Sequence, residues 1–334
     1  MIRRETAASG HGKITIAALA TLVVVLTAGI EIGSVGAQTS TARPIRVIVP
    51  FAAGSYTDSV VRIVASPLSE KLGATIVVDN RPGANGVIGA DIAAKSVPNG
   101  LTLLMGGTSV NAVDPGLYKS LPYDPVKDLV PLARFGVLPF VLLVNLNVPA
   151  KNVTELIEYS KKNPGKLAYA TANSVTLVGM ETLKRDTGAN ILSVPYKSSP
   201  QAMLDLISGQ VQVWVADFAT AMPHVRAGNV RVIAVTMARR SSLLPDVPTV
   251  AEVLKGYDVS AWNGLFAPGG TPREALARIF DAVNAVLTTR DAQEKLTAIG
   301  FDIAPLGPDA FGPYVRAQIG TWGRLIRETG IKPE

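Results

Sequence analysis

The sequence predicts an α/β protein with two lobes joined by two crossover strands. Short apolar runs alternate with helix-like segments after the first 37 residues, a pattern that favours parallel sheets with right-handed crossovers. Two such series follow one another, and a helical C-terminal stretch returns to the first. With 334 residues, 48% of them hydrophobic and 17% charged, the chain exceeds one ordinary domain and can bury a core in each lobe.

The first 37 residues have the composition of an export signal. A basic start precedes an uncharged, mostly apolar run from Ile14 to Ile30, and Val35-Gly36-Ala37 fits a small-x-small cleavage site. The apolar run has 17 residues, the lower limit for spanning a bilayer, so a retained membrane anchor is the alternative. Because a polar, flexible start follows at 38–41, we expect a cleaved signal peptide over residues 1–37 and a periplasmic mature protein.

The first series contains three strands and two helices. We expect strands at 46–51, 75–79 and 101–105, and helices at 57–72 and 86–95. The first of these helices is amphipathic, because one of its faces carries Val60, Val61, Val64, Leu68 and Leu72.

The second series starts at an apolar strand, 141–144. The further expected strands are 166–171, 191–194, 211–216 and 230–236, and the expected helices are 153–162, 177–186, 200–208 and 221–227. A Pro-rich connector then leads through 257–267 into three helical stretches at 273–289, 291–299 and 309–329. This order predicts a discontinuous first lobe (43–141 and 259–334), a second lobe (142–258), and hinges near 141–145 and 257–262.

The composition excludes several classes of chemistry. The chain has no cysteine, which excludes disulfides, thiolate metal sites and thiol nucleophiles, and its two histidines, His11 and His224, argue against a histidine metal site. No P-loop or GxSxG elbow is present, and the spacing Gly83-x-x-Gly86-x-x-Gly89 indicates close helix–strand packing rather than a dinucleotide fingerprint. We interpret His224 as a polar residue on a helix surface. The sequence therefore predicts no catalytic residue, no metal and no cofactor.

The positive charge suits an anionic partner but does not by itself distinguish nucleic acid, a membrane surface and a small acid. The net charge is +6, but the basic pairs Lys161-Lys162 and Arg239-Arg240 are isolated, and no nucleic-acid-binding motif is present. We expect no nucleic-acid partner.

Three loops that follow predicted strands carry small polar residues at helix starts. They lie at 50–58, 106–111 and 169–176, and Gly54 permits a tight turn in the first of them. Free N–H groups at a helix start attract anions, although capping alone explains most such loops. Two such loops, one from each lobe, predict a clamp for the carboxylates of one ligand in the cleft between the lobes.

Five short motifs appear in a characteristic order. They are Arg43-Pro44-Ile45-Arg46 leading to Val49-Pro50-Phe51, Asn80-Arg81-Pro82-Gly83-Ala84, Leu121 to Asp128, Val194-Pro195-Tyr196-Lys197, and Leu243 to Val250. In this order and spacing the chain resembles, from about Arg43 to its C-terminus, the Bug (TctC-like) periplasmic solute-binding proteins of tripartite tricarboxylate transport. The resemblance implies a two-lobed type II periplasmic binding protein with the Venus-flytrap fold, which captures a carboxylated organic acid and is not an enzyme.

The resemblance also implies which residues hold the ligand. In this family the two strand–helix loops hold the carboxylates largely through backbone N–H groups, hydroxyls and water. Trp262, in a returning crossover strand, is either a core anchor or a wall of the cleft. The expected ligand-binding residues are Gly54, Ser55, Tyr56, Thr57, Asp58, Thr108, Ser109, Thr171, Asn173, Ser174, Val175, Thr176, Tyr196, Asp217 and Trp262.

The chain departs from the family pattern in both loops. Ser55 stands where the family has a second glycine, and Asn173 and Val175 stand where it has glycines. Valine does not tolerate the left-handed conformation, so we expect a different backbone path in the second loop. The larger side chains suggest a ligand with an apolar or aromatic body, such as an aromatic or other dicarboxylate, between walls formed by Tyr56, Val175, Phe218 and Trp262.

The expected mechanism is reversible capture by closure of the lobes. The expected partners are a small carboxylate ligand and the membrane permease subunits of a tripartite tricarboxylate-type transporter, with the protein acting as a monomer. Two alternatives remain at this point: the ligand-sensing extracytoplasmic subunit of a signalling system, and an exported carboxylate-ester hydrolase using residues such as Asp58 and His224.

Overall fold

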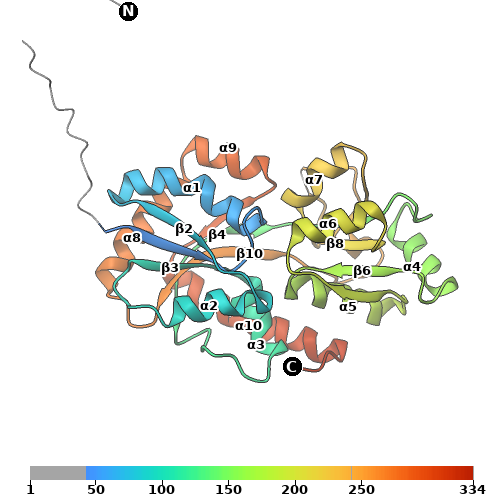
Figure 1. Cartoon of the computed structure of the whole chain (residues 1–334), viewed down its shortest axis with the longest axis horizontal. Helices are drawn as coiled ribbons and strands as arrows, with labels where there is room; N and C mark the ends of the chain where they lie inside the picture. The colour runs from blue at the N-terminus through green and yellow to red at the C-terminus, as the bar shows by residue number, and fades with distance from the viewer. Residues whose placement is uncertain (1–42, 242, 334) are drawn as a thin grey trace, which may run out of the picture. The chain divides into compact units, whose positions relative to one another are not determined.

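Residues 43–241 and 243–333, which the computed structural model describes, form two mixed β-sheets with helices packed on them (Figure 1). The expected signal peptide, residues 1–37, lies outside the described residues. Among the described residues, none of the helices combines the length and the apolarity that a bilayer crossing requires.

The first sheet has the strand order β11-β4-β10-β3-β1-β2. Strand β1 pairs in parallel with β2 and β3, as the first βα series predicts, whereas β10 pairs antiparallel with β3 and β4, and β11 pairs antiparallel with β4. The strands are β1 (Ile45–Val49), β2 (Ile76–Asn80), β3 (Thr102–Gly107), β4 (Leu129–Leu138), β10 (Ala261–Pro268) and β11 (Asp302–Leu306).

The helices of this half include all three of the C-terminal helical stretches that the sequence predicts. They are α1 (Tyr56–Leu72), α2 (Val87–Ala94), α3 (Asp114–Leu117), α8 (Arg273–Leu287), α9 (Arg290–Ala298) and α10 (Pro308–Thr329), with short helices at Ala84–Gly86 and Ser109–Val113. The predicted apolar face of α1 is buried, and the helix ends at Gly73 in the left-handed conformation.

The second sheet has the order β7-β6-β8-β5-β9. Strand β6 pairs in parallel with β7 and β8, and β5 pairs antiparallel with β8 and β9. Its strands are β5 (Phe140–Val144), β6 (Ala168–Thr171), β7 (Leu192–Pro195), β8 (Val213–Asp217) and β9 (Arg231–Val235), and its helices are α4 (Val153–Lys162), α5 (Ser174–Thr187), α6 (Ser199–Ser208) and α7 (Phe218–Arg226).

The chain passes between the two sheets in two places. It leaves β4 at Leu138 and enters β5 at Phe140, and it returns from β9 to β10 through Val259. The change of sheet therefore precedes the segment 141–145 in which we expected the first hinge, because β5 pairs along its whole length within the second sheet. The buried Thr236 ties the two crossings together: its Oγ1 lies 2.6 Å from the Val259 carbonyl oxygen and 3.1 Å from that of Phe140.

The predicted role of the glycine motif in close packing is confirmed. A Cβ atom on Gly89 would lie 2.8 Å from the Arg81 carbonyl oxygen and 2.8 Å from the Pro50 Cα. Helix α2 therefore packs directly on the chain that follows β1.

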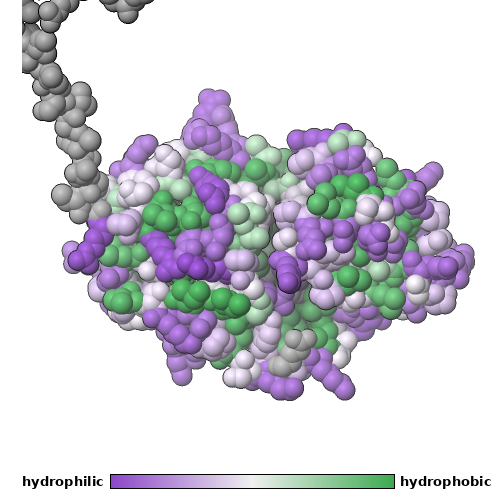
Figure 2. Space-filling view, viewed as in Figure 1, coloured by the Kyte–Doolittle hydropathy of each residue, from purple (hydrophilic) through white to green (hydrophobic). Residues whose placement is uncertain are grey.

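The face of the molecule in Figure 2 carries hydrophilic side chains over both halves, interrupted by small hydrophobic patches. Exposed apolar residues such as Val97 and Leu204 occur among the described residues. Scattered exposure of this kind is ordinary for a folded protein.

Candidate ligand-binding site

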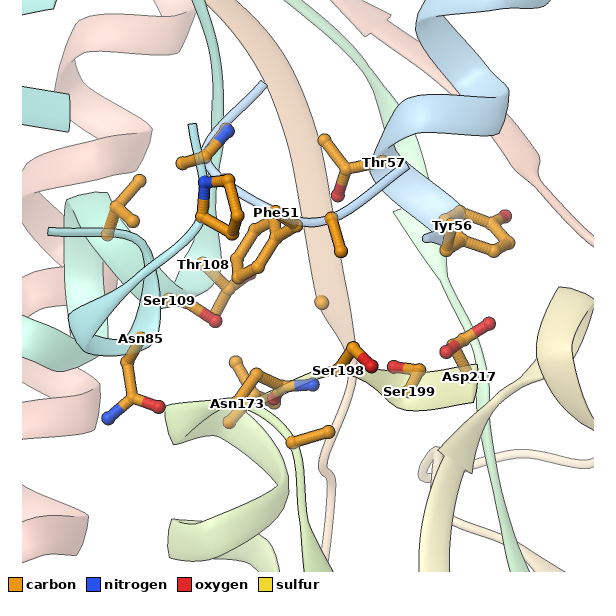
Figure 3. Close-up of a pocket in the computed structure, with 18 of the residues that line it drawn as sticks. Phe51, Tyr56, Thr57, Asn85, Thr108, Ser109, Asn173, Ser198, Ser199 and Asp217 are labelled. Atoms are coloured by element: carbon orange, nitrogen blue, oxygen red, sulfur yellow. The ribbon is translucent and has the colours of Figure 1, made fainter. Parts of the chain in front are cut away.

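A cavity of about 890 Å³ lies between the two halves, and both sheets contribute to its walls. Most of the lining residues follow β1, β2, β3, β6, β7 and β8, at the points where these strands end and helices begin, and others lie at the crossing from β4 to β5 and on β10. This is the place where open α/β sheets bind ligands. Figure 3 shows side chains from both halves pointing into it.

The start of α1 uses some of its polar residues for its own structure. The N-cap residue Ser55 accepts a hydrogen bond from the Asp58 N–H at 3.4 Å. The buried Asp58 carboxylate accepts hydrogen bonds from the N–H of Gly54 (2.9 Å), from Asn80 (3.0 Å) and from Arg62 (2.8 Å). Burial alone would raise the pKa of Asp58, but the hydrogen bonds from Arg62, Gly54 and Asn80 outweigh it and lower this pKa. Asp58 therefore fixes the loop.

The first two residues of α1 line the cavity, and their N–H groups have no partner within the helix. Tyr56 is buried, and its hydroxyl has no hydrogen-bond partner. Thr57 lies beside the buried Asn263, whose Nδ2 is 3.4 Å from its hydroxyl oxygen. This helix start thus presents N–H and hydroxyl groups to a ligand.

The loop after β3 brings Thr108 and Ser109 to the cavity, as we expected. The Thr108 hydroxyl accepts a hydrogen bond from the Trp262 N–H at 2.8 Å, which couples this loop to β10. A Cβ atom on Gly107 would lie 2.5 Å from the Trp262 carbonyl oxygen, so a glycine is required for this approach.

In the second loop, Asn173 caps α5 and also lines the cavity. Its side-chain oxygen accepts a hydrogen bond from the Thr176 N–H at 3.0 Å. Its backbone is extended, with φ −161°, and Val175 lies within α5. Neither residue adopts the left-handed conformation, so the loop accommodates Val175, whose side chain joins the wall of the cavity.

The start of α6 is a feature that sequence reasoning missed. Ser198 is its N-cap residue but makes no capping hydrogen bond with its side chain. Ser198 and Ser199 both line the cavity. Of the described residues that line it, Lys197 is the one with a positively charged side chain. In Figure 3 the two serines lie between Asn173 and Asp217. Their position directly after a predicted strand is the signal that could have revealed them.

Two residues near α6 and α7 have perturbed acidity. The Tyr196 hydroxyl donates to Asp205 at 2.8 Å, and burial together with this carboxylate raises the pKa of Tyr196 to about 12. Asp217 caps α7 by accepting a hydrogen bond from the Thr220 N–H at 2.8 Å. Burial raises the pKa of Asp217, against the opposing effect of hydrogen bonds from Thr220 and Ser199.

Apolar side chains form much of the remaining wall. Trp262 is both a core residue and a wall: it is buried, lines the cavity, and packs edge-on against Phe311 with ring centroids 5.4 Å apart. Phe218 is not among the lining residues, because it packs on Gly300, where a Cβ atom would collide with its ring. Phe51 and Phe140 take part in the wall instead.

The expected ligand-binding residues thus fall into two groups. Those that line the cavity are Tyr56, Thr57, Thr108, Ser109, Asn173, Val175, Tyr196, Asp217 and Trp262. Those that are not among its lining residues are Gly54, Ser55, Asp58, Thr171, Ser174 and Thr176. Lining residues that we did not expect include Phe51, Asn85, Tyr118, Lys197, Ser198, Ser199 and Asn263.

The electrostatics of the cavity favour an anion. In the described chain, α1, α5, α6 and α7 begin at the cavity, with 17, 14, 10 and 9 residues, respectively. Each helix start carries partial positive charge on N–H groups without a partner in the helix. Within the described residues, no cluster of His, Cys, Asp and Glu could hold a metal ion.

The family model described as "Tripartite tricarboxylate transporter family receptor" matches residues 60–331. The chain belongs to this TctC family. One relative of this chain is Protein BugT of Bordetella pertussis. The two sequences are 36% identical over 316 residues, which cover 93% of this chain and 96% of BugT. The family resemblance that the sequence motifs indicate is confirmed.

Solved structures of similar proteins support the same assignment. One is Rpa4515 of R. palustris with adipate, which has a TM-score of 0.85, 33% identity, and coverage of 88% of this chain and 99% of the other. Another is MatC of Rhodopseudomonas palustris with bound malate, with a TM-score of 0.80, 31% identity, and coverage of 86% and 99%. This TctC-family chain is therefore a two-lobed α/β solute-binding protein of a periplasmic family, not an enzyme.

Proposed function

We propose that this protein captures a carboxylated organic acid in its interlobe cavity and delivers it to the permease subunits of a tripartite tricarboxylate-type transporter. The observation that carries the proposal is the meeting of four helix starts from both halves at one cavity that also holds hydroxyl and amide groups. Unpartnered N–H groups at helix starts are suited to a carboxylate. Residues of both halves would then bind the same ligand.

The chemistry of the lining supports a dicarboxylate with an apolar or aromatic body. The N–H groups of α1 and α5 and the hydroxyl of Ser109 would hold one carboxylate, and Lys197 with the start of α6 would hold the second. Phe51, Val175 and Trp262 would enclose the body between them. Two similar proteins have been solved with dicarboxylates, adipate and malate, which supports two carboxylates in the ligand but does not bear on an aromatic body.

Neutral donors are sufficient for useful affinity. A micromolar dissociation constant requires about 8 kcal/mol, and a hydrogen bond to a charged group contributes roughly 1.5–3 kcal/mol. Several such bonds exceed the requirement and leave a margin for the cost of ordering the ligand and the lobes. A dedicated arginine is therefore not needed.

Capture would proceed by rotation of one half against the other. The chain segments that would absorb the rotation are the crossings at Pro139 and at 257–260, which Thr236 holds side by side. The closed form would present a surface from both halves to the permease. We further propose that the protein is exported by cleavage of residues 1–37 and acts as a monomer.

Thermal-shift screening of a carboxylic-acid panel tests the proposal. A ligand that binds only the native state raises the unfolding midpoint, so aliphatic and aromatic dicarboxylates should raise it, and the matching diamides should not. Calorimetric titration then measures the affinity, and the fluorescence of Trp262, with Trp262→Phe as control, reports occupation of the cavity. If no acid raises the midpoint, or if amides do so equally, the proposal is wrong.

A further inference from the structure

A carboxyl group that the proposed capture does not use is buried where the two halves meet. Asp114 is the first residue of α3 and follows directly on the short helix Ser109–Val113 of the first half. The start of α5, which belongs to the second half, packs on that short helix. Ser174 is the first residue of α5, and both it and Asp114 are 0% exposed. Neither of them is among the residues that line the cavity.

These two side chains lack the partners that buried polar groups normally have. Both carboxyl oxygens of Asp114 and the hydroxyl of Ser174 are without a hydrogen bond of ordinary geometry. Such atoms are rare in folded proteins, and an isolated carboxylate costs far more to bury than a neutral carboxyl group. The Ser174 hydroxyl is nevertheless near enough to act on the acidity of Asp114. The two groups therefore face each other across the boundary between the halves.

Among the described residues around Asp114, no cation stabilises its ionised form. Burial raises the pKa of Asp114 well above its usual value, against the opposing effect of Ser174. Burial also raises the pKa of Tyr123, and the charges of Asp114, Tyr118 and Asp91 raise it further. The charged residues of α5 and α10, which pack on this region, are paired among themselves or exposed: Glu181, Lys184, Arg185, Asp186, Asp309, Arg316, Arg324, Arg327 and Glu328.

A neutral carboxyl group carries one O–H donor, which a serine hydroxyl can accept. Rotation of the halves toward each other would bring Asp114 and Ser174 within hydrogen-bond distance, and rotation apart would admit water to both. We infer that Asp114 is a positioning residue: as a neutral acid it donates a hydrogen bond to Ser174 when the halves close, so that capture takes up a proton from solvent at this carboxyl group. This inference rests on the proposed capture of an organic acid and adds that capture weakens as the pH rises.

The direction of this pH dependence follows from the burial of Asp114. In the open form water reaches the carboxyl group, so its pKa lies near the ordinary aspartate value of about 3.9, whereas burial in the closed form raises it. Affinity is therefore highest below the open-form pKa. It falls as the pH rises from that value to the closed-form pKa, by up to about tenfold per pH unit for one proton.

The test compares wild type with Asp114→Asn, with adipate, malate and isophthalate as probes. The amide stays neutral at every pH and offers Ser174 an N–H donor. Calorimetric titration from about pH 4.5 to about 9 gives the ratio of the two dissociation constants, in which the titration of the ligand and of cavity groups such as Asp217 cancels. We expect wild type to bind progressively more weakly than the variant as the pH rises. Titrations in buffers of different ionisation enthalpy should show that wild type takes up more protons than the variant, by up to about one.

Two further variants and one measurement on wild type serve as controls. Asp91, on α2 of the same half, is paired with Lys95 at 2.6 Å, so Asp91→Asn should keep the wild-type pH dependence. Ser174→Ala removes the acceptor and should weaken binding near pH 5 by about two- to tenfold. The ¹³C shift of the Asp114 carboxyl group, followed against pH in the wild-type protein, requires no variant. The neutral form should persist to a higher pH in the complex than in the free protein.

The outcomes distinguish this inference from the proposed function. If wild type and Asp114→Asn bind with the same ratio at every pH and take up equal numbers of protons, Asp114 has no part in capture, although acid capture stands. The same conclusion follows if its carboxyl group titrates at the same pH with and without ligand, or if Asp91→Asn abolishes the pH dependence as fully as Asp114→Asn. If none of the three acids binds at any pH, both the proposed function and this inference are wrong.

Discussion

The starts of α1 and α6 both border the cavity, but they use their polar residues differently. At α1, Ser55 and Asp58 make hydrogen bonds within the loop, and only the residues between them, Tyr56 and Thr57, line the cavity. At α6, Ser198 makes no capping bond with its side chain and lines the cavity. The comparison teaches that a capping residue stabilises its helix, whereas an unused one remains available to a ligand. Four substitutions test this division.

The largest expected effect is on stability, in Asp58→Ala. The substitution removes the carboxylate that accepts hydrogen bonds from Gly54, Asn80 and Arg62, and these three partly buried hydrogen bonds are lost together. We expect the free energy of unfolding, measured by denaturant titration, to fall by about 2–3 kcal/mol.

Measuring the unfolding free energy of Asp58→Ala and wild type at several pH values provides the control for this prediction. Because the pKa of Asp58 in the folded protein lies below its usual value, its stabilising contribution is complete above the ordinary aspartate pKa of about 3.9 and is lost as the pH falls through the folded-state pKa. The difference in unfolding free energy between wild type and variant should be constant from neutral pH to about 5 and should narrow below about 4. A difference that does not change at acidic pH would contradict this role.

The largest effect on affinity is expected in Asn173→Asp. Asn173 both caps α5 and lines the cavity, so it belongs to both sides of the comparison. Aspartate retains the cap but places a negative charge beside the bound acid, and we expect about a tenfold or greater loss of affinity by calorimetric titration. Asn152→Asp is the matched control, because Asn152 caps α4 outside the lining residues and should leave affinity unchanged. Equal losses in both variants would refute the placement of Asn173.

A smaller effect on stability is expected in Ser55→Ala. The Ser55 side chain accepts the Asp58 N–H at 3.4 Å, a long hydrogen bond. We expect a loss of about 0.5–1 kcal/mol in unfolding free energy. Affinity for the acid should remain within about twofold, since Ser55 is not among the residues that line the cavity.

The smallest effect is expected in Ser198→Ala. Unlike Ser55→Ala, it should change the affinity for the acid and leave stability unchanged. Affinity should fall by roughly two- to tenfold, the range for one hydrogen bond, while the unfolding free energy stays unchanged. If Ser198→Ala destabilised the protein and Ser55→Ala weakened binding, the division between the two helix starts would be reversed.

The regular parts of the fold could be predicted from sequence because their patterns are local. The apolar face of α1 and the alternation of strands and helices predicted most elements to within a few residues. Strand β4 was not predicted because Pro131, Arg134 and Gly136 interrupt its apolar pattern. It is nevertheless a central strand that pairs with both β10 and β11. Strand β11 was not predicted because it is short, only partly buried and preceded by a helix.

The candidate site could be predicted only to the level of its loops. Sequence marks a helix start through its capping residues, but whether Ser55 or Ser198 faces a ligand depends on hydrogen bonds that only the folded loop determines. Asn85 reaches the cavity from the loop after β2, which we interpret from sequence only as a packing and family motif. Phe218 was expected in the wall and packs on Gly300 instead, a contact between residues far apart in the chain.

The central claim is that backbone N–H groups at helix starts of both halves bind the acid. The most direct measurement is the change in amide ¹H–¹⁵N chemical shifts on titration with an acid that raises the unfolding midpoint. We predict the largest shifts at Tyr56, Thr57, Val175 and Ser199, with saturation at one common dissociation constant. Shifts confined to one half of the protein, or to residues outside the cavity, would contradict the claim.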